Sequence, residues 1–494
     1  MSLLLRLPRH AALAVGLALG LAFATGAAEP TAVPAARSLR LMAVGDSITA
    51  GADFFSCYRY PLWEKLFAAG YVVEFVGTQR SATRVGPLAH EGYGGKNTEF
   101  LAQTVPAHFR EHPADVVLLH SGHNHTVEEQ PIPGIVAATE RLIAEFRAVN
   151  PRVTVLLAQV IPAGKLPKYA YIPELNTALA ELAGRLDTST QRVVPVDQAT
   201  GFDWTTDTVT DKVHPNARGA EKMAAAWFET LKTVLPPPAR AFSPKPVAYK
   251  TPTGSAPLML HVFAPARNPA PAGGGRPAIV FFFGGGWTHG TPVQLYPECA
   301  HFSDRGFVAI SADYRIASTH RTTPFESAED ARDALRWVRA HAAELGVDPM
   351  RIVLGGASAG GHLAAVTALK AGNEERPAAL LLLYPALDTG PQSRLHASFG
   401  ERFAELSPLH LLSAAATRVL PPTLILVGTA DTLTPVQTAR AFQAAAQGGG
   451  ERCDVVTFAG AGHPIYAYRE GGGPLRAEVL AAADAFFASL AGFR

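Results

Sequence analysis

Two serines, each preceded by a short apolar run, constrain this chain more than any other feature. Ser47 follows the run Leu39–Val44, and Ser358 follows Ile352–Leu354 within a G-x-S-x-G motif. A serine at the carboxyl end of a strand, just before a helix, faces the crevice where open α/β sheets bind ligands. The chain therefore needs one such sheet for each serine.

The order of apolar runs predicts two α/β domains. A chain of 494 residues favours about two or three domains. Short β-branched runs alternate with amphipathic helical stretches twice over, which is typical of parallel sheets covered on both faces. The first series comprises Leu39–Val44, Val72–Gly77, Val116–His120, Val153–Val160 and Arg192–Val196, with helical patterns over Ile135–Val149 and Asn216–Val234. The second comprises Leu258–Phe263, Ala278–Phe283, Val308–Ala312, Ile352–Leu354, Ala379–Leu383, Leu424–Val427 and Asp454–Phe458.

A proline-rich stretch separates the two series. Leu235 is followed by three prolines, and Pro244 and Pro246 come soon after. Proline removes backbone donors and stiffens the chain, so residues 236–248 are interpreted as a semi-rigid linker. We therefore expect a first domain over residues 36–235 and a second over residues 249–494. The two series carry different motifs, so they are not a duplication.

Residues 1–28 predict a secretory signal peptide. Arg6 and Arg9 precede an apolar run from Ala11 to Ala24, and small residues follow. A membrane anchor is the alternative, but the run is shorter than the roughly 20 apolar residues that cross a bilayer. We expect cleavage near Ala24 or Ala28 and a soluble protein in the periplasm or outside the cell.

The charge balance and the cysteines argue against two classes of function, nucleic-acid binding and catalysis by a cysteine. Lys and Arg (43) nearly balance Asp and Glu (42), so the composition predicts no basic surface for nucleic acid. Cys57, Cys299 and Cys453 allow at most one disulfide and leave one thiol free. None lies in a glycine-rich elbow, so a nucleophilic cysteine is not expected.

Candidate partners for Ser47 lie near the end of the first series. Asp211 and His214 precede its last helical pattern, and their spacing lets the carboxylate orient the imidazole. His214 can then take the proton from Ser47 and return it to a leaving alcohol. A plain turn and a helix-capping aspartate beside a surface histidine are the alternatives. Two more segments argue against these: residues 91–95 can offer a bare glycine N–H to an oxyanion, and Asn124 can add a side-chain amide.

Together these pieces resemble the four blocks of the SGNH, or GDSL-type, hydrolases, which are named for Ser, Gly, Asn and His. The resemblance implies a three-layer, flavodoxin-like α/β domain. It implies that Ser47 is the nucleophile and that Asp211 and His214 complete its triad. It also implies that Gly95 and Asn124 form an oxyanion hole with the Ser47 N–H.

The likeness extends over nearly all of residues 38–233. Within this range the chain is similar to the acetylxylan esterases of carbohydrate esterase family three. The segments that carry this likeness are residues 41–49, 73–78, 90–95, 158–162 and 196–202. The resemblance implies deacetylation of a polysaccharide.

One position departs from that family. The residue after the oxyanion asparagine is usually aspartate, and here it is His125. Because this position lies outside the triad, we expect His125→Asp to preserve or raise activity. His120, His123 and His125 together also suggest a metal site, but the segment turns at Gly122 and no carboxylate or cysteine cluster accompanies it, so we expect no metal.

The second serine has a full set of candidate partners. Glycines on both sides of Ser358 suit the strained strand-to-helix turn of a nucleophile elbow, and the next residue, Ala359, can donate its N–H. Upstream, Gly285 and Gly286 end a strand and free backbone N–H groups for an oxyanion. Downstream, Asp431 and His463 each lie just past a strand, which gives the order Ser, Asp, His of α/β hydrolases. Six other histidines of this half lack this placement and are interpreted as surface or structural: His289, His301, His341, His362, His396 and His410.

This half resembles the esterases of the hormone-sensitive-lipase-like and acetyl-esterase type over about residues 249–490. The segments 313–315, 330–338 and 345–349 carry the likeness. The departure is Phe283, where such enzymes usually carry histidine before the glycines. This change leaves the backbone donors in place but alters the side-chain support of the oxyanion loop.

The sequence therefore predicts a secreted esterase with two serine sites that needs no cofactor and acts on an acylated polysaccharide or oligosaccharide. The first domain is expected to remove acetyl groups from xylan or a related polysaccharide, and the second acetyl or feruloyl groups. A lipase, thioesterase or general carboxylesterase is one alternative. In another, one domain is a catalytically silent carbohydrate-binding module. Neither nucleic acid nor, after signal cleavage, membrane is an expected partner.

Overall fold

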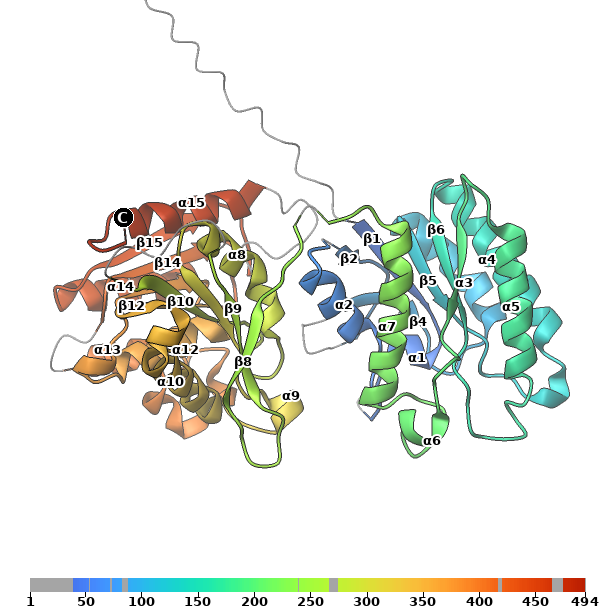
Figure 1. Cartoon of the computed structure of the whole chain (residues 1–494), viewed down its shortest axis with the longest axis horizontal. Coiled ribbons are helices and arrows are strands. Elements are labelled where there is room, and N and C mark those ends of the chain that lie inside the picture. The colour runs from blue at the N-terminus through green and yellow to red at the C-terminus, as the bar shows by residue number, and fades with distance from the viewer. Residues whose placement is uncertain are drawn as a thin grey trace, which may run out of the picture. The chain divides into compact units, whose positions relative to one another are not determined.

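The computed structural model describes residues 39–52, 54–71, 73–81, 88–238, 240–265, 274–415, 420–463 and 474–493. The predicted signal peptide, residues 1–28, lies outside these ranges. Strands β1 to β7 form a seven-stranded sheet, and β8 to β15 form an eight-stranded sheet (Figure 1). Each serine therefore has a sheet of its own.

The first sheet is centred on β1 (Leu39–Gly45). Its order is β3-β4-β1-β5-β6-β7, with β2 also paired to β1. The strand β1 runs parallel to β2, β4 and β5, whereas β3 is antiparallel to β4. The other strands are β2 (Val73–Phe75), β3 (Gln79–Ser81), β4 (Leu88–Gly92), β5 (Val116–His120), β6 (Thr154–Gln159) and β7 (Val193–Asp197).

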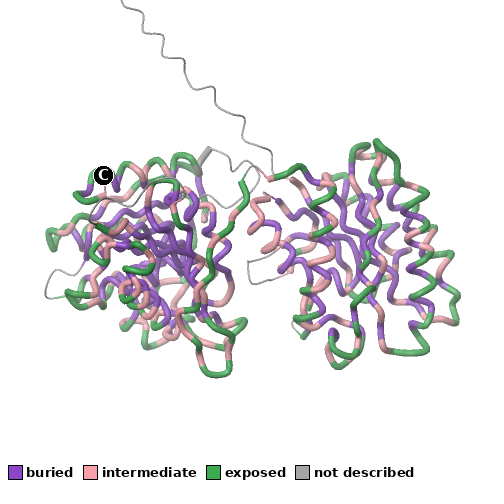
Figure 2. The backbone as a smooth tube through the Cα atoms, viewed as in Figure 1, coloured by how far each residue is buried: buried purple, intermediate pink, exposed green. Residues whose placement is uncertain are grey.

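Helices cover both faces of this sheet because its side chains alternate between two apolar cores. Leu41 and Ala43 pack with α2 and α7, whereas Met42 and Val44 pack with α3, α4 and α5. Figure 2 shows the central strands of this domain as mostly buried and its outer surface as largely exposed. The helices are α1 (Ser47–Ala50), α2 (Arg59–Ala68), α3 (Thr98–Glu111), η1 (Val127–Glu129), α4 (Ile132–Val149), α5 (Ile172–Leu186), α6 (Trp204–Asp207) and α7 (Ala217–Val234).

The second sheet has the order β15-β14-β13-β12-β10-β11-β9-β8. Its strands β10 to β15 are parallel, and β8 and β9 are antiparallel additions at one edge. The strands are β8 (Lys245–Lys250), β9 (Leu258–Phe263), β10 (Arg276–Phe282), β11 (Val308–Ala312), β12 (Val347–Ala357), β13 (Ala379–Leu383), β14 (Thr423–Gly428) and β15 (Cys453–Phe458).

The helix α12 (Ala359–Leu369) follows β12 and is buried along its whole length. It packs against β10, β12 and β13 and is covered by α10 (Pro324–Ala340). A helix that is apolar all round belongs in the core of a large domain. The other helical segments are η2 (Pro292–Leu295), α8 (Tyr296–Asp304), α9 (Ala317–His320), α11 (Ala342–Leu345), η3 (Asn373–Glu375), η4 (His396–Ser398), η5 (Gly400–Glu405), α13 (Pro408–Ala414), α14 (Val436–Gly448) and α15 (Pro474–Ala488).

The structure corrects one predicted boundary. β8 begins at Lys245, so residues 245–248 of the predicted linker are a strand of the second domain. Pro246 misled the sequence interpretation, because proline is tolerated in a strand at the edge of a sheet. The second domain therefore begins before Lys245 rather than at residue 249.

Two further observations concern the whole described chain. Cys57, Cys299 and Cys453 are free thiols. Among the described residues, no helix combines the length and apolarity needed to cross a membrane.

Candidate active sites

The first site forms where β1 ends. Ser47 is the first residue of α1, and its Oγ lies 2.8 Å from His214 Nε2. His214 Nδ1 lies 2.5 Å from Asp211 Oδ2. The structure thus brings the three predicted residues into one hydrogen-bonded chain, although Ser47 and His214 are 167 residues apart in sequence.

A tight turn presents Asp211 and His214 on the same side of the chain. Lys212 has a left-handed φ of 61°, and Asp211 Oδ1 accepts hydrogen bonds from the N–H groups of Val213 and His214. Burial acts to raise the pKa of Asp211, but these hydrogen bonds and the one from the His214 ring hold it below its ordinary value. Asp211 therefore stays ionised near neutral pH and fixes the orientation of the imidazole.

Two phenylalanines complete the surroundings of His214. The ring of Phe55 stacks on the imidazole, with centroids 4.2 Å apart, and Phe54 contacts it edge-on. Both rings line a cleft of about 320 Å³ together with Ser47, Gly95 and Asn124. Sequence reasoning missed Phe54 and Phe55, because nothing in the spacing of adjacent aromatics links them to a histidine far along the chain.

The two predicted oxyanion residues face this cleft. Gly95 has a φ of 71°, which glycine adopts freely, and a Cβ there would meet open space. Asn124 has a φ of 65°, and its Nδ2 donates one hydrogen to the carbonyl of Lys96 at 2.9 Å. An amide nitrogen carries two hydrogens, so one remains for an oxyanion.

Below the nucleophile lies a group of buried polar side chains. Asp46 caps α1 through the Ile48 N–H, and its other oxygen lies 3.8 Å from His123 Nδ1. His123 Nε2 bonds the carbonyl of Ile161, and the His120 ring is stacked on the His123 ring. Burial raises the pKa of Asp46 to about 7 and lowers those of His120 and His123 to about 3 and 4. These histidines are therefore neutral core residues.

His125 is separate from that buried group. Its two ring nitrogens face Glu99 and Glu129, at 3.0 and 2.7 Å. The three histidines of this segment thus have different neighbours. Within the described ranges, no group of three or more His, Cys, Asp or Glu side chains is arranged to hold a metal ion.

The second nucleophile lies in a strained turn between β12 and α12. Ser358 has a φ of 52° and a ψ of −114°, a conformation that L-residues rarely adopt. Glycine is required two residues later, because a Cβ on Gly360 would lie 1.9 Å from the carbonyl oxygen of Phe282. This close approach explains the G-x-S-x-G pattern in physical terms.

Ser358 is also joined to its predicted partners. His463 Nε2 lies 3.0 Å from Ser358 Oγ, and His463 Nδ1 lies 2.7 Å from Asp431 Oδ2. Asp431 follows β14 and His463 follows β15, so two neighbouring parallel strands deliver the acid and the base. Burial acts to raise the pKa of Asp431, but hydrogen bonds from His463 and Thr434 keep it below its ordinary value.

Thr434 is a site residue that sequence reasoning missed. Its hydroxyl donates to Asp431 Oδ2 at 2.7 Å and lies 3.1 Å from His463 Nδ1. Its backbone N–H also bonds Asp431 Oδ1. A threonine three residues after an aspartate is common in turns, so its sequence position gave no signal.

The predicted oxyanion glycines lie in the loop after β10. A Cβ on the preceding residue, Gly284, would come within 3.4 Å of Ser358 Cβ, so the loop passes close to the nucleophile. Gly285 and Gly286 have φ values of 138° and 60°. Ala359 opens α12, where the backbone N–H has no partner within the helix. The structure thus brings the start of this glycine loop beside Ser358 and places the Ala359 N–H directly after it, and the oxyanion role of the three donors stays a prediction.

Phe283 supports this loop in a different way from the histidine of the resembling family. Its ring stacks on Tyr314, with centroids 4.1 Å apart, and the Tyr314 hydroxyl donates to the Phe283 carbonyl at 2.8 Å. An aromatic stack and a backbone hydrogen bond thus replace a polar side chain. Both groups are fully buried.

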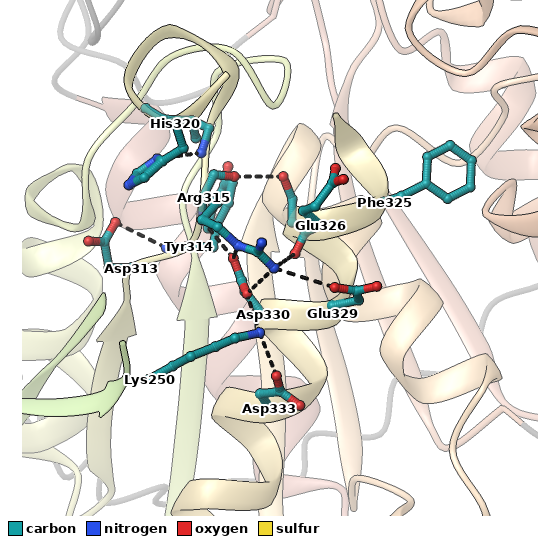
Figure 3. A network of polar contacts seen from close by, with 12 residues as sticks. Lys250, Asp313, Tyr314, Arg315, His320, Phe325, Glu326, Glu329, Asp330 and Asp333 are labelled. Carbon is teal, nitrogen blue, oxygen red and sulfur yellow. Dashed lines mark hydrogen bonds and ion pairs between the residues drawn. The ribbon is translucent and has the colours of Figure 1, made fainter. Parts of the chain in front are cut away.

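Charged side chains fix the segment that carries Tyr314 (Figure 3). The next residue, Arg315, makes two 2.8 Å contacts with Asp330 through Nε and Nη2. Lys250 Nζ lies 2.6 Å from both Asp330 and Asp333. The forked pair of Arg315 and Asp330 is geometrically specific, so it ties the segment after β11 to the helix α10.

A cavity of about 200 Å³ lies beside the second triad. Thr434 and Ala386 both line it, and the Ala386 N–H donates to the carbonyl of Ser358 at 3.2 Å. Asp388, Arg394 and Leu433 also contribute to its wall. The sequence analysis identified none of these lining residues.

Comparison with known proteins agrees with this division. Residues 43–222 match the model of the GDSL-like lipase/acylhydrolase family, and residues 279–405 match that of the alpha/beta hydrolase fold. The esterase LipC of Mycobacterium tuberculosis is 30% identical over 195 residues, which are 34% of this chain and 47% of that protein. Carboxylesterase NlhH of the same species is 41% identical over 113 residues, 22% of this chain and 34% of that protein. The chain thus spans less than half the length of these curated relatives.

Among solved structures, the native esterase Est2 of the planctomycete Thermogutta terrifontis is 38% identical, with a TM-score of 0.46. The match covers 51% of this chain and 93% of that one. The propionate-bound form of the same esterase is equally similar, with a TM-score of 0.46 and 38% identity over 51% of this chain and 95% of that one. The family models, one for each sheet and its serine, confirm the predicted fold class: the chain consists of a GDSL-like domain followed by an alpha/beta hydrolase domain.

Proposed function

We propose that this protein is a carboxylic ester hydrolase with two independent active sites. The first removes acetyl groups from xylan or a related plant cell-wall polysaccharide. The second removes acetyl groups at other positions or a larger acyl group such as feruloyl. The observation that carries the proposal is that each serine Oγ lies within 3.0 Å of a histidine that is itself paired with an aspartate.

Each site has the groups that acyl transfer needs. The serine oxygen attacks the ester carbonyl carbon while the histidine Nε2 takes the serine proton, and the glycine and asparagine donors stabilise the resulting oxyanion. The bond to the alcohol then breaks, and the histidine gives its proton to the departing oxygen. Water repeats the sequence on the acyl-enzyme, which releases the acid and restores the serine. The names of the curated relatives, esterase and carboxylesterase, support this reaction class.

Two features favour an acylated polysaccharide for the first site. The segments of residues 38–233 resemble acetylxylan esterases, as described above. In addition, Phe54 is 70% exposed at the rim of the cleft that holds Ser47. An exposed apolar ring beside a catalytic cleft offers a contact surface for the part of the substrate that does not react.

A second candidate applies to the second site. The curated relatives include proteins named carboxylesterase and carboxylic ester hydrolase. These names favour a general carboxylesterase for small esters, in place of a polysaccharide esterase. Secretion is part of the main proposal, because residues 1–28 have the layout of a signal peptide.

Nucleophile variants test the proposal. Loss of a triad nucleophile lowers kcat by about 10⁶-fold, so Ser47→Ala and Ser358→Ala should each remove one activity from a panel of acetylated xylan, feruloylated oligosaccharide and p-nitrophenyl acetate. The double variant should lose all of them. If Ser358→Ala leaves every substrate unchanged while Ser47→Ala abolishes them all, the second domain is not an esterase. If neither variant releases less acetate from xylan than wild type, the polysaccharide assignment fails.

A further inference from the structure

Three side-chain contacts join the two segments that carry the oxyanion donors of the first site. Thr98 Oγ1 lies 2.8 Å from Ser121 Oγ, Asn124 Nδ2 donates to the Lys96 carbonyl, and His125 Nε2 lies 3.0 Å from Glu99 Oε2. One segment follows Gly95 into α3, and the other follows β5 to Asn124. Of these contacts, the one made by His125 pairs two ionisable side chains.

The geometry around His125 indicates a charged ring. Nε2 faces Glu99 Oε2 at 3.0 Å, and Nδ1 faces Glu129 Oε2 at 2.7 Å. Carboxylate oxygens only accept hydrogen bonds, so a ring that bonds one through each nitrogen donates from both. That form is the imidazolium, and its side chain is 9% exposed, against 34% for Glu99 and 52% for Glu129.

The surrounding charges agree with this assignment. The hydrogen bond from His125 is the main cause that holds the pKa of Glu129 below its ordinary value. Glu99 lies in the first turn of α3, where the helix dipole favours a negative charge. Glu128 of η1, Lys96 before α3 and Tyr171 before α5 are further titratable or charged groups on the neighbouring segments.

The neighbouring residue is the predicted oxyanion donor Asn124. Its φ of 65° is a left-handed conformation that asparagine tolerates better than most residues, so the placement of its amide depends on the contacts around it. Its amide has to stay close to Gly95 for both to reach the same oxyanion. His125, anchored to α3 on one side and to η1 on the other, provides that support directly after Asn124.

We propose that His125 is a positioning residue of the first active site: its charged ring, paired with Glu99 and Glu129, holds Asn124 beside Gly95. This inference rests on the proposed function of the first domain. It also accounts for the departure from the aspartate of the resembling family, because an aspartate at this position would face two carboxylates. The structure thus argues against the expectation that His125→Asp preserves or raises activity.

Charge rescue tests the inference. All variants are made in the full chain with Ser358→Ala, so that only the first site turns over p-nitrophenyl acetate. His125→Asp should lower kcat about tenfold or more with KM little changed, as expected for a group that acts on the transition state. Adding Glu99→Gln and Glu129→Gln should restore kcat to within about threefold of the Ser358→Ala parent, because the repulsion is removed. A His125→Asp protein with unchanged kcat, or one that the two glutamines fail to rescue, would overturn the inference.

If His125→Asp does not fold, a second pair of variants that each remove a single charge tests the pairing of His125. Glu129→Gln removes one partner of the ring and should lower kcat a few-fold. Glu128→Gln makes the same charge change on the same short helix, at an exposed residue without a contact to His125, and should leave kcat unchanged. Equal kcat values for the two variants would contradict the pairing. Thermal melts of both proteins verify that they are folded.

Charge retention supplies a readout that mere packing would not move. His125→Arg keeps a positive charge between the two glutamates, whereas His125→Gln keeps polar groups without the charge. The kcat of His125→Arg should therefore stay closer to that of the parent than the kcat of His125→Gln. Equal kcat values for these two variants would overturn the inference. A Ser358→Ala parent without any esterase activity would instead overturn the proposed function of the first domain.

Discussion

The two sites form similar triads, but the sequence separation between the acid and the base differs greatly. In the first, Asp211 and His214 belong to one turn and are three residues apart. In the second, Asp431 and His463 are 32 residues apart and follow two adjacent strands. The acid and base of the first site are therefore set by local backbone geometry, whereas those of the second depend on the register of the sheet.

The nucleophiles and acids differ as well. Ser47 begins a helix that Asp46 caps, whereas Ser358 is held at a positive φ by close backbone packing. The side chain of Asp211 is 26% exposed, whereas that of Asp431 is fully buried. The first site is thus open and built from side chains, and the second is enclosed and built from strained backbone. Two triads with the same arrangement of Ser, His and Asp can therefore be held in place by different structural elements.

The largest loss of kcat is expected when the aspartate of either triad is replaced. Asp211→Asn and Asp431→Asn should each lower kcat of their own site by about 10⁴-fold, because the imidazole then favours the wrong tautomer. Each variant should leave the other site unchanged. Steady-state rates of Asp211→Asn in a Ser358→Ala background, and of Asp431→Asn in a Ser47→Ala background, measure this. A loss smaller than about tenfold would remove that aspartate from the triad.

Loss of a side-chain oxyanion donor should lower kcat at the first site and leave kcat at the second site unchanged. Asn124→Ala should lower first-site kcat by about a hundredfold or more, because it removes a side-chain donor. The second site, whose predicted donors are all backbone N–H groups, should be unaffected. Measured kcat values for both sites test this, and an unchanged first-site rate would exclude Asn124 from the oxyanion hole.

A smaller effect is expected from the hydroxyl that supports the second acid. Thr434→Val keeps the shape but removes the hydrogen bond to Asp431, so second-site kcat should fall about tenfold, in line with the worth of a hydrogen bond to a charged group. Thr457→Val, at an exposed position of β15, is the matched control and should change little. Similar rates for the two variants would show that Thr434 is not needed to hold the acid.

The smallest effect is expected when the domains are separated. Because each triad is complete within its own half, residues 29–235 and residues 240–494 should each fold alone and keep kcat within about twofold. The second fragment includes β8, as the structure requires. Thermal melts and rates of both fragments are the measurements. Aggregation of either fragment under conditions where the whole chain is soluble would argue against independent domains.

Much of the fold could be predicted from the sequence. The runs Val116–His120, Val308–Ala312 and Ala379–Leu383 coincide with strands of the structure, because buried parallel strands are continuous apolar segments. The short strands β3 and β4 and the edge strand β8 were missed. Polar residues and a proline interrupt them, so their strand character comes from pairing with a neighbour rather than from their own pattern.

The sequence by itself identified the candidate nucleophiles, their candidate acids and bases, and the glycines around them. These residues lie in short motifs, since a strand end, a tight turn or an elbow restricts which amino acids fit at each position. Only the tertiary structure decided what supports them: the stack of Phe55 on His214, the bond of Thr434 to Asp431 and the pairing of His125 with Glu99. Such contacts join side chains that no local backbone rule relates. Their partners are set by how strands and helices pack, which residue spacing alone does not encode.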